Sequence, residues 1–380
     1  MVTKILVLPP ISYKYLYGGI LHRTDFCREL ASLNYEVFAI GDETVPVNHL
    51  HLYRLFDPTL TVHKSLHTYF LLAPFLIIYT IFVLLLINIK NINAVLLFYP
   101  PGIRDRLPMI LFSKTKFGKK LIVFLIGHVG GEKKLRTRIA FMFDRTILMN
   151  ADNIVSTSKE ITKSFMNKFS INQRKVIHIN YGVSRYRSMI HVSQKLARKK
   201  LKLPPEPFIA ITVTRYTPFR GCEYFLKAAK EVQNRTKNIL FIFVGARTGQ
   251  LYETKIKQNA SEMKLKILFF DNVPYNLIPL FLRAANCLVL TSPIDNWCDA
   301  LREGLANATP IVSFDAGIHR KLPGVLAAKT ENHTELANII LKLVQQPKLY
   351  EQTAKEAYKT YNESFSLEKE IIKLMSKLNL

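Results

Sequence analysis

Short apolar runs alternate with helix-patterned stretches along nearly the whole chain of 380 residues. The apolar runs predict strands at Ile5–Leu8, Glu36–Ile40, Ala94–Phe98, Leu121–Ile126, Asn153–Ser156 and Val176–Ile179, and in a second series at Phe208–Thr214, Leu240–Val244, Lys266–Phe270, Cys287–Leu290 and Pro310–Ser313. Helical stretches such as Ile20–Leu33 and Leu135–Met149 lie between them. Strands that alternate with helices form parallel sheets covered on both faces. The two series therefore predict an α/β protein with two Rossmann-like domains.

The places where this pattern stops suggest the domain boundaries. A chain of 380 residues exceeds what one hydrophobic core usually fills, so two domains are expected. We predict a first domain over residues 1–183, a charged linker over 184–205 and a second domain over 206–364. Residues 365–380 have the pattern of an amphipathic helix, which we expect to pack back on the first domain.

Composition excludes several classes of protein. With 49% hydrophobic residues the chain can fill real cores, which excludes a disordered protein. The four cysteines lie far apart, with no CxxC and no histidine at ligand spacing. A disulfide scaffold and a zinc module are therefore not expected.

Positive charge dominates, most of all in the first half. The chain has 53 Lys and Arg against 28 Asp and Glu, a net charge of +25, of which residues 1–200 carry +18 and the remainder +7. Such an excess suits phosphate-bearing substrates, anionic lipid headgroups or nucleic acid. Because no helix-turn-helix, zinc finger or aromatic RNA-binding pattern is present, nucleic acid is not an expected partner.

One apolar segment bears on localisation. Residues 65–89 contain no Asp, Glu, Lys or Arg, and 25 positions are long enough to span a membrane. His67, Pro74 and the strand-like run that follows argue against spanning, so docking in the membrane surface and an ordinary buried helix stay open beside it. The N-terminal residues lack the apolar region of a secretory signal. We therefore expect a cytoplasmic protein, peripheral at the inner face of the cell membrane.

Candidate ligand-binding residues stand where predicted strands end. Ligands of doubly wound sheets bind there, because helix N-termini and glycine turns present N–H groups to phosphate. Gly18-Gly19 follows the first strand, although the absence of GxGxxG excludes an ordinary nicotinamide fingerprint. Arg215 and Arg220 flank a turn that closes at Gly221 and opens a helix. Two guanidiniums beside a helix N-terminus predict a cradle for a diphosphate, although exposed loop arginines look the same in sequence.

Other strand ends of the second series carry further candidates. Gly245 ends one strand and turns toward the same crevice, as a plain strand-to-helix turn also does. Asp295 and Glu303 stand eight residues apart after another strand. One carboxylate can accept hydrogen bonds from sugar hydroxyls and the other from a ribose, while an acidic pair on a solvated surface has the same spacing.

The order and spacing of these motifs resemble retaining glycosyltransferases of the GT-B fold, specifically glycosyltransferase family 4, also called glycosyltransferase group 1. The family's asparagine-glycine-valine turn corresponds to Asn180-Tyr181-Gly182-Val183, with an inserted Tyr. Its glycine-arginine and lysine-glycine phosphate motif corresponds to Thr214-Arg215 and Arg220-Gly221, its paired glutamates to Asp295 and Glu303, and its alanine-glycine-threonine-proline stretch to residues 305–310. The resemblance implies an acceptor-binding and a nucleotide-sugar-binding domain that face each other across a cleft.

Three departures from the family pattern bear on specificity. Arg for Lys at 220 keeps the charge needed for diphosphate binding. Asp for Glu at 295 shortens the reach to the donor sugar by one methylene. A small glycine-containing turn is replaced by Asn296-Trp297-Cys298, so donor and acceptor preference are expected to differ.

The resemblance also implies roles for individual residues. His128 corresponds to a histidine that faces the donor sugar, Gly18-Gly19 to a glycine loop near the donor phosphates, and Val273 to the region of backbone contacts with the base. The expected catalytic residues are His128, Asp295, Arg215 and Arg220. The expected donor contacts are Gly18, Gly19, Gly245, Arg215, Arg220, Val273, Asp295 and Glu303.

The activity implied is retaining transfer of a hexosyl unit from a UDP- or GDP-sugar to a glycan or lipid-linked acceptor. No Asp-x-Asp motif occurs, so we expect no metal and no other cofactor. Two alternatives share the same motifs, namely a GT-B nucleotide-sugar epimerase or hydrolase and a non-catalytic nucleotide-sugar-binding protein.

Overall fold

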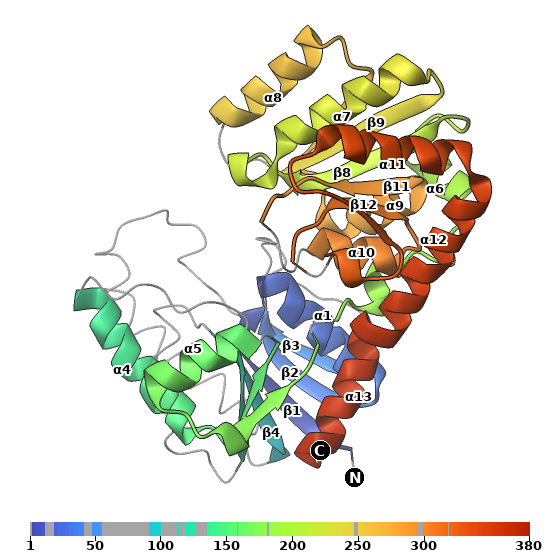
Figure 1. Cartoon of the computed structure of the whole chain (residues 1–380). Helices are drawn as coiled ribbons and strands as arrows, with labels where there is room; N and C mark the ends of the chain where they lie inside the picture. The colour runs from blue at the N-terminus through green and yellow to red at the C-terminus, as the bar shows by residue number, and fades with distance from the viewer. Residues whose placement is uncertain are drawn as a thin grey trace. The chain divides into compact units, whose positions relative to one another are not determined.

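The computed structural model describes residues 2–11, 19–41, 48–54, 91–99, 113, 119–125, 135–157, 159–180, 182–246, 250–294, 299–317 and 319–380. The chain forms two compact units: unit 1 is Met1–Tyr181 with Leu367–Leu380, and unit 2 is Gly182–Ser366. Figure 1 shows a strand-and-helix arrangement in each unit. The predicted fold class, two Rossmann-like α/β domains, is confirmed.

Unit 1 is built on a seven-stranded parallel sheet. Its strands are β1 (Lys4–Ile11), β2 (Glu36–Gly41), β3 (Leu50–Arg54), β4 (Ala94–Tyr99), β5 (Lys120–Leu125), β6 (Asn153–Ser156) and β7 (Val176–His178). They lie in the order β3-β2-β1-β4-β5-β6-β7. The described helices of this unit are α1 (Gly19–Ser32), α4 (Leu135–Asn150), α5 (Lys159–Phe169) and α13 (Leu367–Leu378).

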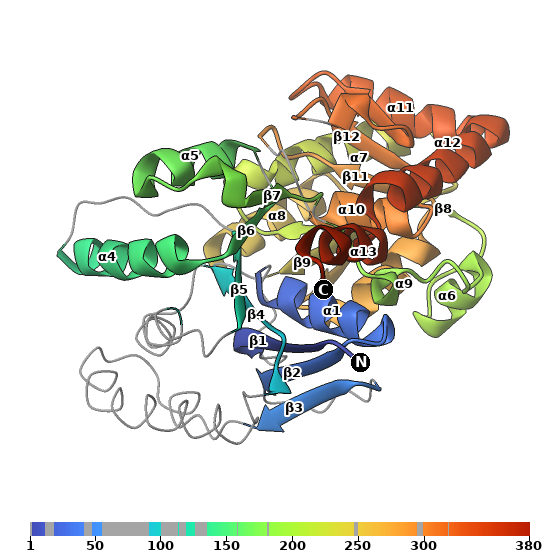
Figure 2. The ribbon, with the colours of Figure 1, turned by 90° about the horizontal axis from the view of Figure 1, so that it is seen from below.

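Helices cover both faces of this sheet. The apolar side chains of α1 and α13 pack on one face, and those of α4 and α5 pack on the other. Figure 2 shows α1 and α13 side by side, and the two helices are in contact. Leu367, Ile371, Leu374, Met375 and Leu378 are all buried in that core, at the spacing of an amphipathic helix. The last helix of the chain is therefore part of unit 1.

Unit 2 is built on a six-stranded parallel sheet. Its strands are β8 (Phe208–Arg215), β9 (Ile239–Ala246), β10 (Ile267–Asp271), β11 (Cys287–Leu290), β12 (Ile311–Phe314) and β13 (Val325–Ala328). They lie in the order β10-β9-β8-β11-β12-β13. The α-helices are α6 (Gln194–Lys200), α7 (Cys222–Arg235), α8 (Gln250–Glu262), α9 (Ile278–Ala284), α10 (Asp299–Ala306), α11 (His333–Gln345) and α12 (Pro347–Thr360). Short 3-10 turns relevant to the site are η5 (Arg185–Arg187), η6 (Pro218–Arg220) and η7 (Tyr275–Leu277).

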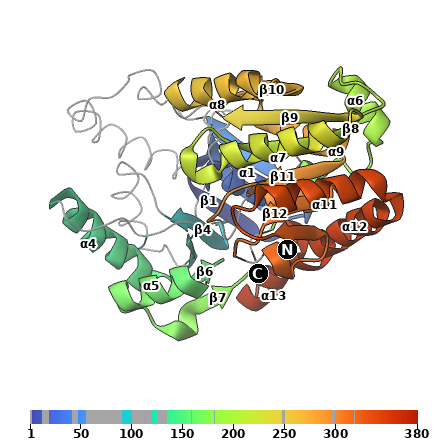
Figure 3. The same cartoon turned by 45° about the horizontal axis from the view of Figure 1, so that its top comes forward.

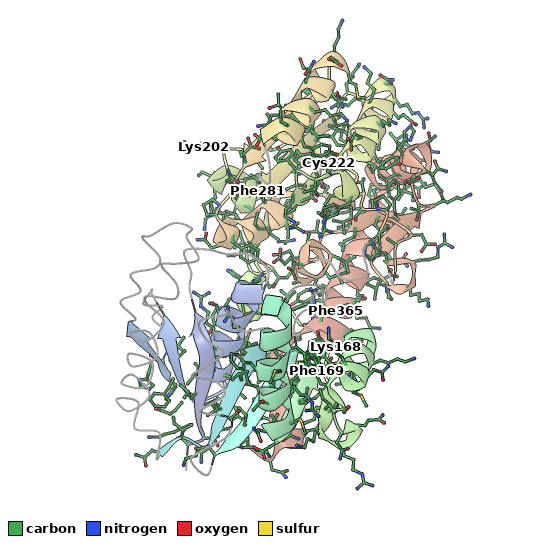
Figure 4. All side chains as sticks on the ribbon, turned by 90° about the vertical axis from the view of Figure 1, so that its left-hand side faces the viewer. Lys168, Phe169, Lys202, Cys222, Phe281 and Phe365 are labelled. Carbon is green, nitrogen blue, oxygen red and sulfur yellow. The ribbon has the colours of Figure 1, made fainter. Side chains whose placement is uncertain are left out.

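Two apolar cores sandwich this second sheet. Side chains of α7, α8 and α11 fill the core on one face, and side chains of α6, α9, α10 and α12 fill the core on the other. Figure 3 shows α7 and α11 running beside each other. Figure 4 labels one side chain from each core, Cys222 on α7 and Phe281 on α9.

Strand order reverses between β8 and β11. The chain first adds β9 and β10 on one side of β8, and then adds β11, β12 and β13 on the other. The connections that leave the carboxyl ends of β8 and β11 therefore diverge to opposite sides of the sheet, and a doubly wound sheet binds its ligands at this point.

Residues 184–205, expected to be a linker, are folded into unit 2. The buried side chain of Arg198 on α6 donates hydrogen bonds to the carbonyl of Ala284 at 3.0 Å and to Oδ1 of Asn286 at 2.6 Å. A buried guanidinium is stable only with such partners. One of the basic residues that suggested a linker, Arg198, thus attaches α6 to the rest of unit 2.

Within the ranges listed above, no helix is both long and apolar enough to cross a membrane. The apolar segment 65–89 lies outside those ranges, so its three alternatives stay predictions.

Candidate functional site

The turn between β8 and α7 is held tightly against the end of β11. Gly221 has φ +65°, and a β carbon at this position would lie 2.0 Å from the carbonyl oxygen of Thr291. The hydroxyl of Ser292 donates to the carbonyl of Phe219 at 3.1 Å, and that of Thr291 donates to the carbonyl of Arg220 at 3.3 Å. Only glycine meets both the backbone angle and the close approach. Gly221, which closes the predicted turn, therefore allows the turn to lie against β11, at the point where strand order reverses.

Arg215 and Arg220 gather around one exposed aromatic ring. Their guanidinium carbons lie 5.9 and 5.5 Å from the centroid of Phe219, whose side chain is 55% exposed. Gly221 caps α7 without a side-chain hydrogen bond, so no side chain caps the first N–H groups of this 14-residue helix. We call Arg215, Phe219, Arg220 and Gly221 the cradle. Two guanidiniums and a helix N-terminus together suit an anionic ligand such as a diphosphate.

Gly245, at the end of β9, packs against the ring of Tyr216. A β carbon on Gly245 would lie 2.1 Å from the ring of Tyr216, the residue that follows β8. The Tyr216 ring stacks on Phe243 at 4.9 Å, and its hydroxyl donates to Oδ1 of Asp271 at 2.8 Å. Burial and this hydrogen bond raise the pKa of Tyr216. Gly245 thus has a packing role, because the absence of a side chain leaves room for the buried ring of Tyr216.

Glu303 lies in α10, one turn after the helix begins, and its side chain is 2% exposed. Arg187 donates from Nη1 to Oε1 of Glu303 at 2.7 Å, and the Tyr275 hydroxyl donates to the same oxygen. The Arg187 guanidinium lies 4.1 Å from the centroid of the Tyr275 ring. We call Arg187, Tyr275 and Glu303 the clamp. It holds a buried carboxylate with a guanidinium and a hydroxyl as its hydrogen-bond donors.

A second layer of hydrogen bonds fixes the clamp. The buried Asn307 donates from Nδ2 to the carbonyls of Arg187 at 3.0 Å and Glu303 at 2.8 Å. Its Oδ1 accepts from the backbone N–H of Met189 at 2.7 Å, and Ser188 Oγ donates to the carbonyl of Ala306 at 2.7 Å. The turn η5 and the helix α10 are therefore joined through both backbone and side chains.

The described site residues that were predicted in unit 2 all lie toward the carboxyl ends of strands of the second sheet. Arg215 and Arg220 follow β8, Gly245 ends β9, Val273 follows β10, and Glu303 belongs to the helix after β11. Gly19 is the first residue of α1 in unit 1. Gly18, His128 and Asp295 lie outside the described residues.

Sequence reasoning missed Arg187 and Tyr275. Arg187 falls in the charged stretch that was expected to be a linker, and Tyr275 follows Val273 by two positions without a motif of its own. The proximity of Tyr275 to the expected base contacts was the one signal available. An arginine in a charged stretch and a tyrosine after a strand are common in sequences, so neither residue indicated a buried contact with Glu303.

Residues 193–360 match the family model of Glycosyl transferases group 1. The protein is a glycosyltransferase. The match covers most of unit 2, including the cradle and Glu303, and the resemblance predicted from the motifs is confirmed. No curated protein sequence matches the chain.

Solved structures show the same fold over the whole length of the glycosyltransferase. A glycosyltransferase from Rickettsia africae ESF-5 superposes with a TM-score of 0.70 at 15% identity, covering 99% of this chain and 97% of that one. Sucrose-phosphate synthase (tll1590) from Thermosynechococcus elongatus superposes with a TM-score of 0.68 at 16% identity, covering 100% and 99%. Anabaena Alr3699/HepE in complex with UDP superposes with a TM-score of 0.67 at 14% identity, covering 100% of both chains. At these identities the likeness shows the fold alone.

Across the described parts of the chain, no three His, Cys, Asp or Glu side chains are grouped as ligands for a metal ion. Transfer without a metal stays a prediction.

Proposed function

We propose that this glycosyltransferase moves a hexosyl unit from a UDP- or GDP-sugar to a glycan or lipid-linked acceptor, with retention of configuration and without a metal. The observation that carries the proposal is the cradle, where two arginines and an uncapped helix N-terminus meet at the point where strand order reverses. A nucleoside diphosphate is the leaving group that such a place binds best. Solved complexes of the similar Anabaena protein with UDP and with UDP-glucose support this donor class.

The chemistry follows from where negative charge develops. As the bond between C1 of the sugar and the diphosphate oxygen breaks, Arg215 and Arg220 stabilise the charge on the leaving phosphate. The acceptor hydroxyl forms the new bond to C1 on the same face, and its proton passes to the leaving diphosphate. Glu303 accepts hydrogen bonds from the ribose. Asp295 and His128, which the resemblance places beside the donor sugar, orient it and stabilise its oxocarbenium-like transition state.

The acceptor is proposed from the first half of the chain. Residues 1–200 carry a net charge of +18, and the 65–89 segment is free of charged residues. An anionic, lipid-linked acceptor at the cytoplasmic face of a membrane suits both features.

A transfer assay with membrane lipids tests this proposal. The protein is incubated with tritiated UDP-glucose, UDP-galactose or GDP-mannose and a bacterial lipid extract, in EDTA, and the label is measured in the organic phase. We expect one donor to label a lipid, with an α linkage from an α-linked donor by NMR. Nucleotide release without a labelled product would indicate a hydrolase. An inverted anomer, or loss of transfer in EDTA, would contradict the proposed mechanism.

A further inference from the structure

We infer that Arg187 and Tyr275 are positioning residues, which hold the Glu303 carboxylate for the vicinal 2′- and 3′-hydroxyls of the donor ribose and thereby give the site its preference for ribonucleotides. The inference deepens the proposed function and rests on it. It concerns two residues that touch Glu303 and lie outside the motifs of the sequence analysis.

The charge state of the buried Glu303 carboxylate depends on its neighbour Arg187. A carboxylate that is 2% exposed loses its hydration, which favours the protonated form unless a cation stands beside it. The Arg187 side chain is itself 7% exposed and lies 2.7 Å away. Arg187 therefore keeps Glu303 ionised, and an ionised carboxylate accepts hydrogen bonds from sugar hydroxyls more strongly than a neutral acid does.

Arg187 and Tyr275 also fix the orientation of the Glu303 carboxylate. Both donors bind Oε1, so the carboxylate is held through one oxygen from two directions. Arg187 is held in turn, because its guanidinium lies over the Tyr275 ring and its carbonyl accepts from Asn307. A binding group whose own supports are fixed keeps the geometry that its ligand needs. The two hydroxyls of a ribose require a carboxylate with a defined plane.

A residue that positions Glu303 and a residue that only stabilises the fold have different effects on nucleotide binding. A buried ion pair also fastens η5 to α10, and removing one partner destabilises any protein. A purely structural pair would weaken all nucleotides equally when it is changed. A pair that orients Glu303 affects a ligand with both ribose hydroxyls more than a 2′-deoxy ligand, which has lost one of them.

Titration calorimetry with matched nucleotides tests the inference. UDP and 2′-deoxy-UDP, and likewise GDP and 2′-deoxy-GDP, are titrated into the wild type and into Arg187→Lys, Arg187→Met and Tyr275→Phe. Arg185→Ala is the matched control, because Arg185 lies in the same turn and is exposed. Arg187→Lys retains a cation beside Glu303, so nucleotide binding can still be measured in a folded variant if Arg187→Met unfolds.

We expect the wild type to prefer the ribonucleotide about tenfold or more, the equivalent of one hydrogen bond to a charged group. In the Arg187 variants the preference falls to about threefold or less, because ribonucleotide affinity drops more than that of the 2′-deoxynucleotide, which keeps only the 3′-hydroxyl. Tyr275→Phe lowers the preference in the same way but by less, and Arg185→Ala retains it. Folded Arg187 variants that weaken both nucleotides equally, or neither, would overturn the inference alone. A wild type that binds no nucleoside diphosphate would overturn the proposed function and the inference with it.

Discussion

The cradle and the clamp both lie toward the carboxyl ends of the strands of the second sheet, yet their charged side chains differ in exposure to solvent. Arg215 of the cradle is exposed and Phe219 is 55% exposed, whereas the side chains of Arg187 and Glu303 in the clamp are 7% and 2% exposed. Exposed charges contribute little to stability and are available to a ligand. Buried partners stabilise each other and fix an orientation, but they cannot be removed singly without cost. The comparison predicts that changes in the clamp act first on folding, and changes in the cradle act first on the donor.

The largest effect is expected from Arg187→Ala. It leaves the Glu303 carboxylate buried without its cation, which lowers the free energy of unfolding by about 3–5 kcal/mol. Urea denaturation measures the change. Arg187→Met combined with Glu303→Leu removes both charges and should recover most of the loss, while Arg185→Ala should stay within about 0.5 kcal/mol of the wild type. A loss below about 1 kcal/mol for Arg187→Ala would mean that water reaches the clamp.

The next effect is expected from Gly221→Ala in the cradle. The new β carbon meets the Thr291 carbonyl oxygen and the residue stays in a left-handed conformation, so we expect a loss of about 2–4 kcal/mol in unfolding free energy. At this position the backbone of the cradle is as constrained as the side chains of the clamp, so the change acts on folding first. An unchanged thermal transition would show that the turn can move away from β11.

Arg220→Ala should weaken the donor without weakening the fold. Loss of one charged contact to the diphosphate raises donor KM and lowers kcat, with affinity reduced roughly 10- to 100-fold. Because Arg220 is half-buried, the free energy of unfolding should change by no more than about 1 kcal/mol. Arg235→Ala, at the opposite end of α7, is the control that removes the same charge without touching the cradle. Equal kinetics in the two variants would exclude Arg220 from phosphate binding.

The smallest effect concerns Cys222, the first residue of α7. A helix N-terminus ordinarily lowers the pKa of a thiol, but burial raises the pKa of Cys222 to about 11. The thiol therefore stays protonated at neutral pH and becomes reactive only as the pH approaches that value. We expect no iodoacetamide labelling of Cys222 at pH 8, measured by peptide mass spectrometry. Rapid labelling at pH 8 would show that the helix N-terminus is more open than the contacts of Sγ with the carbonyls of Arg215 and Thr217 indicate.

Most of the fold could be predicted from hydrophobic patterning, because buried parallel strands have continuous apolar runs. The expected strand at Asn153–Ser156 agrees with β6, and Phe208–Thr214 differs from β8 by one residue. Two strands were missed. β3 has His51 and Arg54 among its five residues, which an edge strand tolerates, and β13 has only four residues, two of them alanine. β3 thus lacks a continuous apolar run, and the run in β13 is short and weakly hydrophobic.

The site was predictable in part for a physical reason. Gly221, the arginines beside it and Glu303 belong to local motifs, in which a turn or a helix start fixes the spacing. Arg187 and Tyr275 reach Glu303 across 116 and 28 residues of chain, and only the folded sheet brings them together. Contacts of that kind leave no local pattern. The predicted roles of Gly18, His128 and Asp295 stay predictions.

A thermal-shift panel with donors tests whether the second unit binds a nucleotide-sugar through the cradle and Glu303. UDP-, GDP-, ADP- and dTDP-sugars are added to the wild type, Arg220→Ala and Glu303→Gln, each with and without EDTA. We expect one ribonucleotide donor to raise the unfolding temperature by the same amount with and without EDTA, and this rise to be lost or strongly reduced in both variants. No rise with any donor, or an equal rise in the variants, would contradict this expectation.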